Sequence, residues 1–295
     1  MKDGTSMELT KIINKIKEYG KLVMFSHTIF SLSFAAVSII LAANGLPHIS
    51  TIFWILVCFM GARTGANAIN RVIDSEIDAQ NPRTSKRQIP KGEVKKEEVI
   101  IFTTICFLIM LFGAYKLNYV CLFLSPIALF LMIIYSYTKR FTFLCHLILG
   151  VTCACAPVGA WLAITGKITL IPLIMGVANT LWVAGFDIIY GSQDYEFDKS
   201  NNLHSIPVQF GVKNALLISM FFHIITLFCL FIIGLLSPQL GIIYYIGLVI
   251  IACLFIAEYR IVSPSNLTNV NIASYSINQL VSIVLLLFGI LDAFI

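Results

Sequence analysis

Apolar stretches long enough to cross a lipid bilayer follow one another along almost the whole chain. A transmembrane helix needs about 20 predominantly apolar residues, because a helix rises about 1.5 Å per residue and the hydrocarbon layer is about 30 Å thick. Such stretches lie at about 22–43, 50–70, 97–115, 119–137, 143–164, 168–189, 213–236, 239–258 and 271–294. The sequence therefore predicts an all-α fold, a polytopic membrane protein with nine transmembrane helices in a bundle.

The composition agrees with a membrane protein and excludes a water-soluble one. Hydrophobic residues make up 58% and charged residues 12% of the 295 residues, whereas soluble domains contain about 45–50% and about 25%. The net charge of +5 does not indicate nucleic acid, because the cations lie in short loops between apolar stretches, where membrane topology explains them. We expect a lipid bilayer around the chain, no nucleic-acid partner and no required protein partner.

The distribution of lysine and arginine predicts the orientation. Residues 1–21 combine lysines with apolar residues at roughly helical spacing, which is typical of an amphipathic helix on the membrane surface. Residues 22–295 then form a single transmembrane domain. With the N-terminal segment in the cytoplasm, only Lys116 and Lys167 fall on the opposite side. We expect an integral protein of the inner (cytoplasmic) membrane, with the N-terminus and the charged loops in the cytoplasm.

A first acidic motif follows the second apolar stretch. Asn70, Asp74 and Asp78 are spaced four residues apart, so a continuous helix would place all three on one face. Oxygen ligands of this kind suit a divalent cation such as Mg²⁺. The alternative is a set of solvated charges at the end of a helix.

A second acidic motif has similar spacing after the sixth apolar stretch. Asp187, Asp194 and Asp198 would share one face if the helix runs past the membrane edge. Gly185 and Gly191 predict that this helix is bent or loosely packed. Two facing acidic clusters favour metal binding over solvated charges, because two Mg²⁺ ions between them could neutralise a diphosphate.

Several cations are expected on the same side of the membrane as both acidic motifs. They can bind phosphate oxygens through charge-assisted hydrogen bonds, although the positive-inside rule alone also explains them. The candidates for diphosphate binding are Arg83, Arg87, Lys139 and Arg140.

Arg63 lies seven residues before Asn70, hence on the same helical face and about two turns deeper in the membrane. A cation at that depth is costly unless it meets an anion. It either pairs with an aspartate or receives an anionic substrate group such as an aromatic carboxylate.

These residues form part of a longer pattern that resembles the UbiA family of intramembrane aromatic prenyltransferases, in its 4-hydroxybenzoate polyprenyltransferase-like branch. The resemblance covers nearly the whole chain and implies a nine-helix bundle around a central cavity that is capped on the cytoplasmic side. The matching segments are Asn70-x-x-x-Asp74-x-x-x-Asp78, Asn81-Pro82-Arg83-Thr84, Tyr135-Ser136-Tyr137-Thr138-Lys139-Arg140, the segment from Asp187 to Asp198, and Ser205-Ile206-Pro207-Val208-Gln209-Phe210-Gly211.

The resemblance also implies the parts of an active site. It implies a polyprenyl diphosphate donor, an aromatic acid acceptor, catalytic roles for Asp187, Tyr190 and Lys139, and acceptor binding by Arg63 and Asn67. We expect Asp187 to orient or deprotonate the phenol. The aromatic residues expected to shield an allylic cation are Phe130, Tyr135, Tyr137, Trp182 and Phe186. The residues implied to hold Mg²⁺ are Asn70, Asp74, Asp78, Asp194 and Asp198.

The expected reaction is transfer of a polyprenyl group to an acid such as 4-hydroxybenzoate in quinone biosynthesis. Enzymes of the 4-hydroxybenzoate branch usually carry Asp where this chain has Arg71, which leaves a dihydroxynaphthoate of menaquinone biosynthesis as the alternative acceptor. An ion-coupled transporter is an alternative of another class, because it also carries repeated acidic residues in membrane helices. The position of both acidic motifs at one membrane edge, beside basic loops, favours the enzyme.

Overall fold

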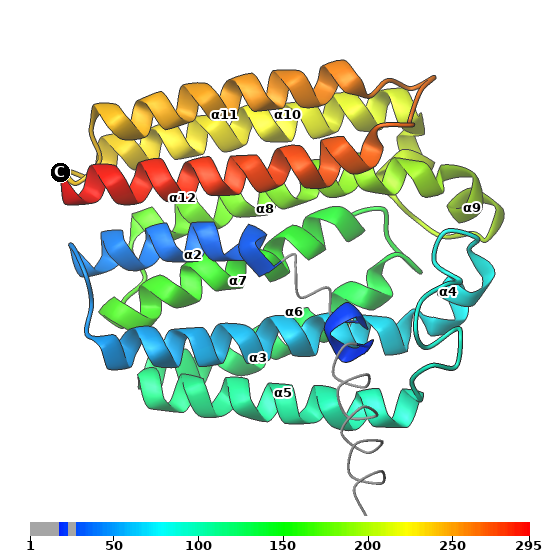
Figure 1. Ribbon diagram of the computed structural model, residues 1–295, viewed down its shortest axis with the longest axis horizontal. Helices are drawn as coiled ribbons and strands as arrows, with labels where there is room; N and C mark the ends of the chain where they lie inside the picture. Colours follow the sequence, from blue (N-terminus) through cyan, green and yellow to red (C-terminus); the bar gives the residue numbers. More distant parts are fainter. Residues whose placement is uncertain (1–17, 23–27) are drawn as a thin grey trace, which may run out of the picture.

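The computed structural model describes residues 18–22 and 28–295, and these residues form a helical bundle (Figure 1). Most of the amphipathic helix predicted over residues 1–21 lies outside the described residues. Within them there is no β-strand, only an isolated bridge between Ser263 and Asn266. The helices are α2 (Thr28–Ala43), α3 (Ile49–Ile73), α4 (Ser75–Gln80), α5 (Lys96–Leu117), α6 (Tyr119–Thr138), α7 (Cys145–Thr165), α8 (Leu170–Gly191), η2 (Ser192–Asp194), α9 (Tyr195–Ser200), α10 (Ile206–Leu236), α11 (Ile242–Ile261), η3 (Ile272–Ile277) and α12 (Asn278–Phe294).

The prediction of an all-α bundle with nine membrane helices is confirmed. In the described part of the chain, eight helices are long and apolar enough to cross a membrane, and α2 adds a shorter apolar helix of 16 residues. The long helices lie side by side, and the connections that carry α4 and α9 gather at the end of the bundle opposite the C-terminus (Figure 1).

Helix α10 consists of two helical segments joined at Gly211, and the longer, second segment begins close to the predicted start at residue 213. Ser205 caps it, since its hydroxyl accepts a hydrogen bond of 3.3 Å from the Val208 amide. Pro207 lies in the first turn, where its missing N–H leaves no carbonyl unpaired. At Gly211 the backbone φ of +76° produces a kink. The proline and the glycine resemble loop residues in sequence, yet both are compatible with a capped and kinked helix.

One side of the bundle is a closely packed core of α2, α7, α8, α10, α11 and α12. Trp182 stacks on Phe34 with ring centroids 5.1 Å apart, and its indole N–H donates to the Asn278 side-chain oxygen at 2.7 Å. Asn278 in turn donates to the fully buried Glu258 carboxylate at 2.7 Å. Such contacts satisfy polar groups that water cannot reach in a bilayer.

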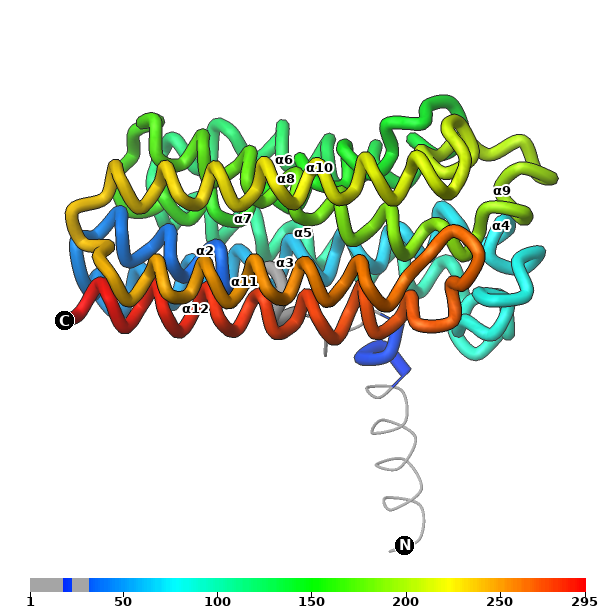
Figure 2. The backbone as a smooth tube through the Cα atoms, turned by 90° about the horizontal axis from the view of Figure 1, so that it is seen from above, coloured from blue at the N-terminus to red at the C-terminus, as the bar shows by residue number. Residues whose placement is uncertain are grey.

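Both acidic motifs lie at breaks between helices and not on the continuous helices that the sequence predicted. Helix α3 ends at Ile73 and α4 starts at Ser75, with Asp74 at the junction (φ −89°, ψ 0°). The 3-10 turn η2 separates α8 from α9. Figure 2 gives a second view in which α4 and α9 lie near each other at the same end of the bundle as in Figure 1. The two motifs therefore converge.

Candidate active site

The first motif begins with a hydrogen-bonded pair at the end of α3. The Asn70 amide donates to the Asp74 carboxylate at 2.7 Å and to the Ser136 hydroxyl of α6 at 3.2 Å. A guanidinium nitrogen of Arg140 lies 3.6 Å from the other Asp74 oxygen. Burial, together with the nearby negative charge of Asp78, raises the pKa of Asp74 above its ordinary value.

Asp78 pairs with the loop that follows its own helix. Nη1 of Arg87 donates to both carboxylate oxygens, at 2.7 and 2.6 Å. The Thr84 hydroxyl donates to the Asp78 backbone carbonyl at 3.2 Å. The loop after α4 is thereby folded back over the motif, and the carboxylate is buried.

Asp194 connects the second motif to the first. Arg83 donates to it from Nε at 2.9 Å and from Nη2 at 2.5 Å, and the Asn81 amide adds a bond of 3.0 Å. Burial alone would lower the pKa of Arg83, but its hydrogen bonds to Asp194, the negative charge of that carboxylate and the nearby Tyr190 together outweigh burial and raise this pKa. Nη1 of Arg83 also donates to the Tyr190 hydroxyl. This arrangement ties the loop after α4 to the end of α8.

Asp198 is buried in α9 and faces the end of α6. Nζ of Lys139 lies 2.7 Å from one of its oxygens. Burial would lower the pKa of Lys139, but the negative charge and hydrogen bonding of Asp198, together with the negative charge of Asp194, outweigh burial and raise this pKa. Neither Asp198 oxygen has a hydrogen-bond partner of good geometry, although the residue is only 1% exposed.

The residues predicted from sequence to hold metal and diphosphate therefore meet at one end of the bundle. Each predicted cation pairs with one predicted carboxylate: Arg140 with Asp74, Arg87 with Asp78, Arg83 with Asp194, and Lys139 with Asp198. The convergence depends on both helix breaks and on the loop between α4 and α5. The roles of these residues in binding metal or diphosphate stay predictions.

Asp187 stands apart from these ion pairs. Its carboxylate contacts Nδ1 of His146 in α7 at 2.7 Å. Of the two alternatives expected at the nearby glycines, loose packing is wrong, because a Cβ at Gly191 would lie 2.9 Å from the His146 ring and one at Gly185 would lie 2.3 Å from His223. The helix instead changes its course after Gly191, where the 3-10 turn η2 follows α8. Sequence reasoning missed His146, although an ionisable residue in an apolar stretch is itself a signal of function.

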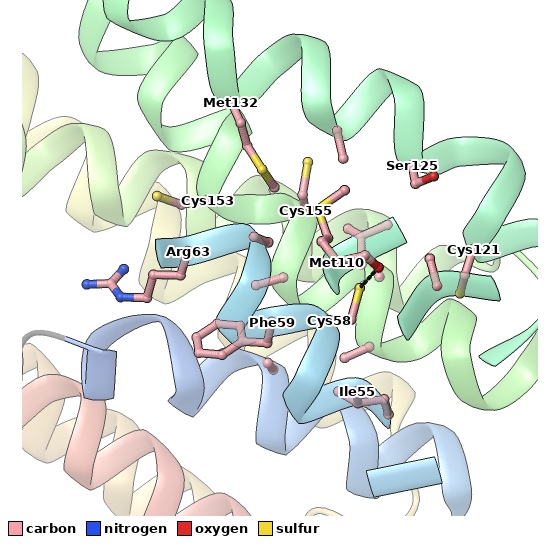
Figure 3. A pocket seen from close by; sticks show the side chains of 18 of the residues that line it. Ile55, Cys58, Phe59, Arg63, Met110, Cys121, Ser125, Met132, Cys153 and Cys155 are labelled. Atoms are coloured by element: carbon pink, nitrogen blue, oxygen red, sulfur yellow. Dashed lines mark hydrogen bonds between the residues drawn. The ribbon is translucent and has the colours of Figure 1, made fainter. Parts of the chain in front are cut away.

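An apolar cavity of about 360 Å³ lies between α2, α3, α5, α6 and α7. Arg63, Asn67 and Tyr135 line it among mainly aliphatic and cysteine side chains. Figure 3 shows Arg63 and Cys153 toward one end of the labelled side chains and Cys121 toward the other. Because Asn67 is one turn before Asn70 on α3, the Arg63 end of the cavity is the one nearer the acidic motifs.

Most of the aromatic residues that were expected to shield an allylic cation lie outside the cavity. Phe130 is 63% and Tyr137 39% exposed on the outside of the bundle, where lipid surrounds a membrane helix. Trp182 is buried in the core, and Phe186 packs against it. Of these residues, only Tyr135 lines the cavity, and its hydroxyl donates to the Ala66 carbonyl at 3.1 Å.

The donor chemistry at the charged end of the bundle fits Mg²⁺. Carboxylate and amide oxygens are the ligands this ion prefers, and the buried Asp198 carboxylate pairs with Lys139 without a hydrogen bond of good geometry to either oxygen. Across residues 18–22 and 28–295, no three His, Cys, Asp or Glu side chains form a ready-made metal cluster. The carboxylates are instead engaged with arginine and lysine side chains.

The bundle of apolar helices, with a charged end above an apolar cavity, defines an integral membrane protein. Its family follows from comparison with known proteins. The model of the UbiA prenyltransferase family matches residues 31–283, and the chain belongs to this family.

Curated relatives are similar over most of their length. The 4-hydroxybenzoate octaprenyltransferase of Francisella tularensis subsp. mediasiatica is 29% identical over 259 residues, which cover 86% of this chain and 89% of the relative. The protein of the same name from Vibrio campbellii is 28% identical, over 84% of this chain and 88% of its own.

Solved structures share the fold. The apo structure of a UbiA homolog from Aeropyrum pernix K1 superposes with a TM-score of 0.81 and 31% identity, covering 90% of this chain and 98% of that one. A UbiA homolog from Archaeoglobus fulgidus, bound to DMAPP and Mg²⁺, has a TM-score of 0.63 at 20% identity and covers 91% and 99% of the two chains. At that identity the second likeness shows the fold alone.

Proposed function

We propose that this protein transfers a polyprenyl group from polyprenyl diphosphate to an aromatic acid such as 4-hydroxybenzoate, in quinone biosynthesis. The observation that carries the proposal is the convergence of both acidic motifs and four cations above one apolar cavity. A prenyl diphosphate has an anionic head and an apolar tail, so it matches both parts. The names of the curated relatives support this substrate class.

The charged end binds the donor diphosphate. Arg83, Arg87, Lys139 and Arg140 exchange their carboxylate partners for phosphate oxygens, which are recognised by the same charge-assisted hydrogen bonds. Asn70, Asp74, Asp78, Asp194 and Asp198 would hold Mg²⁺, which when bound supplies Lewis-acid stabilisation of negative charge on the departing diphosphate. The Archaeoglobus fulgidus homolog, bound to DMAPP and Mg²⁺, supports this assignment.

The cavity end near the motifs receives the acceptor. Arg63 lines it, and its planar guanidinium can bind a carboxylate through two parallel hydrogen bonds. Asn67, one helical turn further along, offers an amide to the same molecule. A carboxylated ring is common to 4-hydroxybenzoate and to a dihydroxynaphthoate of menaquinone biosynthesis, so the second acid stays the alternative acceptor.

The reaction breaks one C–O bond and one C–H bond and forms one C–C bond. Diphosphate leaves with the electron pair of the allylic C–O bond, while Lys139 neutralises its charge and Tyr190 holds Arg83 in place through the hydroxyl. The ring carbon ortho to the phenolic hydroxyl donates a π-electron pair to the allylic carbon. Asp187 accepts a hydrogen bond from that hydroxyl and increases the electron density of the ring. The proton on the attacked carbon then passes to the released diphosphate, and the electron pair of the C–H bond restores aromaticity.

The site lies on the cytoplasmic side of the inner membrane in this proposal. The basic residues of the loops after α4 and α6 favour that side under the positive-inside rule. Water-soluble acceptors would then enter from the cytoplasm, and the prenyl donor from the bilayer.

The test is prenyl transfer by the purified protein with a labelled prenyl diphosphate. 4-Hydroxybenzoate and a dihydroxynaphthoate are compared in parallel with donors of several lengths, with Mg²⁺ and with EDTA. Mg²⁺-dependent label in one aromatic acid supports the proposal and names the acceptor. No labelled product from either acid, together with proton or Na⁺ flux into vesicles, would favour the transporter alternative.

A further inference from the structure

The pair of His146 and Asp187 joins two helices beside the cavity. Nδ1 of His146 in α7 lies 2.7 Å from Oδ2 of Asp187 in α8. The histidine side chain is only 4% exposed, whereas the aspartate side chain is 27% exposed. The histidine is therefore enclosed by protein, while the carboxylate it contacts remains open to a ligand.

Packing fixes the His146 ring. A Cβ at Gly191 would lie 2.9 Å from its Cε1, and one at Gly150 would lie 2.2 Å from the Thr180 carbonyl of α8. Because α7 and α8 approach closely at both glycines, little space is left for the imidazole to turn away from Asp187. The close packing therefore favours the observed hydrogen bond to the carboxylate.

The surroundings of Nε2, the second ring nitrogen of His146, indicate which nitrogen carries the hydrogen. Nε2 of His146 is buried and has no hydrogen-bond partner. A protonated ring would leave a charged N–H unsatisfied there, which is costly in a low-dielectric interior. The tautomer with its hydrogen on Nδ1 avoids this, because it donates to Asp187 and leaves only a lone pair on Nε2.

The pair of His146 and Asp187 lies close to the cavity along α7. Leu149 is one turn and Cys153 two turns beyond His146 on this helix, and both line the cavity, with Cys153 toward the same end as Arg63 (Figure 3). A ring whose carboxylate is bound by Arg63 would therefore have Asp187 within the same neighbourhood.

We propose that His146 is a positioning residue that donates a neutral hydrogen bond to one oxygen of Asp187 and so aims the other oxygen at the acceptor's phenolic hydroxyl. This inference rests on the proposed function, in which Asp187 accepts a hydrogen bond from that hydroxyl. Since the histidine acts on orientation in the transition state, its loss lowers kcat and leaves the KM of the prenyl donor unchanged.

The experiment compares His146→Leu and His146→Asn, each in the wild-type and the Asp187→Asn background. Leucine removes the donor at similar size, whereas asparagine places an amide N–H at the same number of bonds from the backbone as Nδ1 and cannot carry a proton. We expect His146→Leu to lower kcat about ten- to a hundred-fold, as for loss of a hydrogen bond to a charged group. His146→Asn should restore most of it. In the Asp187→Asn background, His146→Leu should have no further effect, because residues that act as one unit are not additive.

Thermal unfolding of each variant separates positioning from simple destabilisation, since kcat is expressed per folded enzyme. Unchanged kcat in His146→Leu would overturn the inference, as would an equal loss in both backgrounds. An Asn variant as impaired as the Leu variant would mean that the ring must carry a proton, which also overturns it. Full activity of Asp187→Asn would refute the proposed role of Asp187, whereas absence of prenyl transfer by the wild type would refute the proposed function itself.

Discussion

Arg83 and Asp194 form a two-pronged ion pair across 111 residues of sequence, with Nε and Nη2 donating to separate carboxylate oxygens at 2.9 and 2.5 Å. This pair holds the loop after α4 against the end of α8, so it brings the two acidic motifs into one site. It also holds in place a cation that the proposal assigns to the diphosphate. In this proposal the Arg83 guanidinium therefore has both a structural role and a role in binding the substrate.

Replacing Arg83 should weaken binding of the prenyl diphosphate. Arg83→Ala should lower kcat/KM for the donor about ten- to a hundred-fold, because it removes charge-assisted hydrogen bonds. Arg83→Lys should retain only part of the wild-type kcat/KM for the donor, since an ammonium cannot make two parallel hydrogen bonds to one carboxylate or phosphate. Lys86→Ala, an exposed cation of the same loop, is the matched control and should leave the donor KM unchanged. Equal effects of Arg83→Ala and Lys86→Ala would contradict the assignment.

Removing either acidic motif should abolish turnover if both hold metal. Asp74→Ala and Asp194→Ala are each expected to be inactive at any Mg²⁺ concentration, and the double variant should be no worse than the singles. Glu76→Ala is the control, because Glu76 lies between the motif residues, is 86% exposed and forms a surface ion pair with Lys96. Activity assays over a Mg²⁺ titration check this prediction. Full activity of both single variants would contradict the assignment of these carboxylates as metal ligands.

The orientation of the protein in the membrane can be measured by labelling introduced cysteines from each side. Lys86→Cys, in the loop after α4, should react with a membrane-impermeant thiol reagent only from the cytoplasmic side. Leu46→Cys, 75% exposed in the loop between α2 and α3, should react only from the other side. The unmodified protein gives the background from its native cysteines. Labelling on the reversed sides would overturn the topology.

The close packing at Gly185 makes a prediction about stability. A Cβ there would lie 2.3 Å from Nε2 of the buried His223, so Gly185→Ala should destabilise the protein by about 1–3 kcal/mol through overpacking. Gly159→Ala is the matched control, because a Cβ there meets nothing within 4 Å. It should be neutral or slightly stabilising. A melting temperature unchanged in Gly185→Ala would show that the helices can separate at this point.

The helical bundle could be predicted because a transmembrane helix is specified by a long apolar stretch. The short helical segment before Gly211 was not predicted, because Pro207 and Gly211 are compatible with a loop as well as with a helix start and a break. The breaks at Asp74 and at η2 were also missed, since four-residue spacing predicts a continuous helix while tertiary contacts of the loops decide where it bends. Local sequence carries little information on those contacts.

The charged part of the candidate site could be predicted from the sequence. The acidic motifs and the four cations stand out in an apolar chain, and the structure brings them together. The partner of Asp187 was not predicted, because a single histidine in an apolar stretch does not reveal which helix it faces. Phe130 and Tyr137 were wrongly placed in the cavity, since an aromatic side chain is equally compatible with lipid and with a cavity wall.

The central claim is that the charged end and the apolar cavity form one site in which an aromatic acid meets the prenyl donor. The most direct test measures kcat/KM for an aromatic acid and for its carboxamide, with the wild type and with Arg63→Ala. The account predicts that Arg63→Ala loses about ten- to a hundred-fold with the acid, little with the carboxamide, and leaves the donor KM unchanged. Equal losses with the two acceptors, or a raised donor KM, would contradict it.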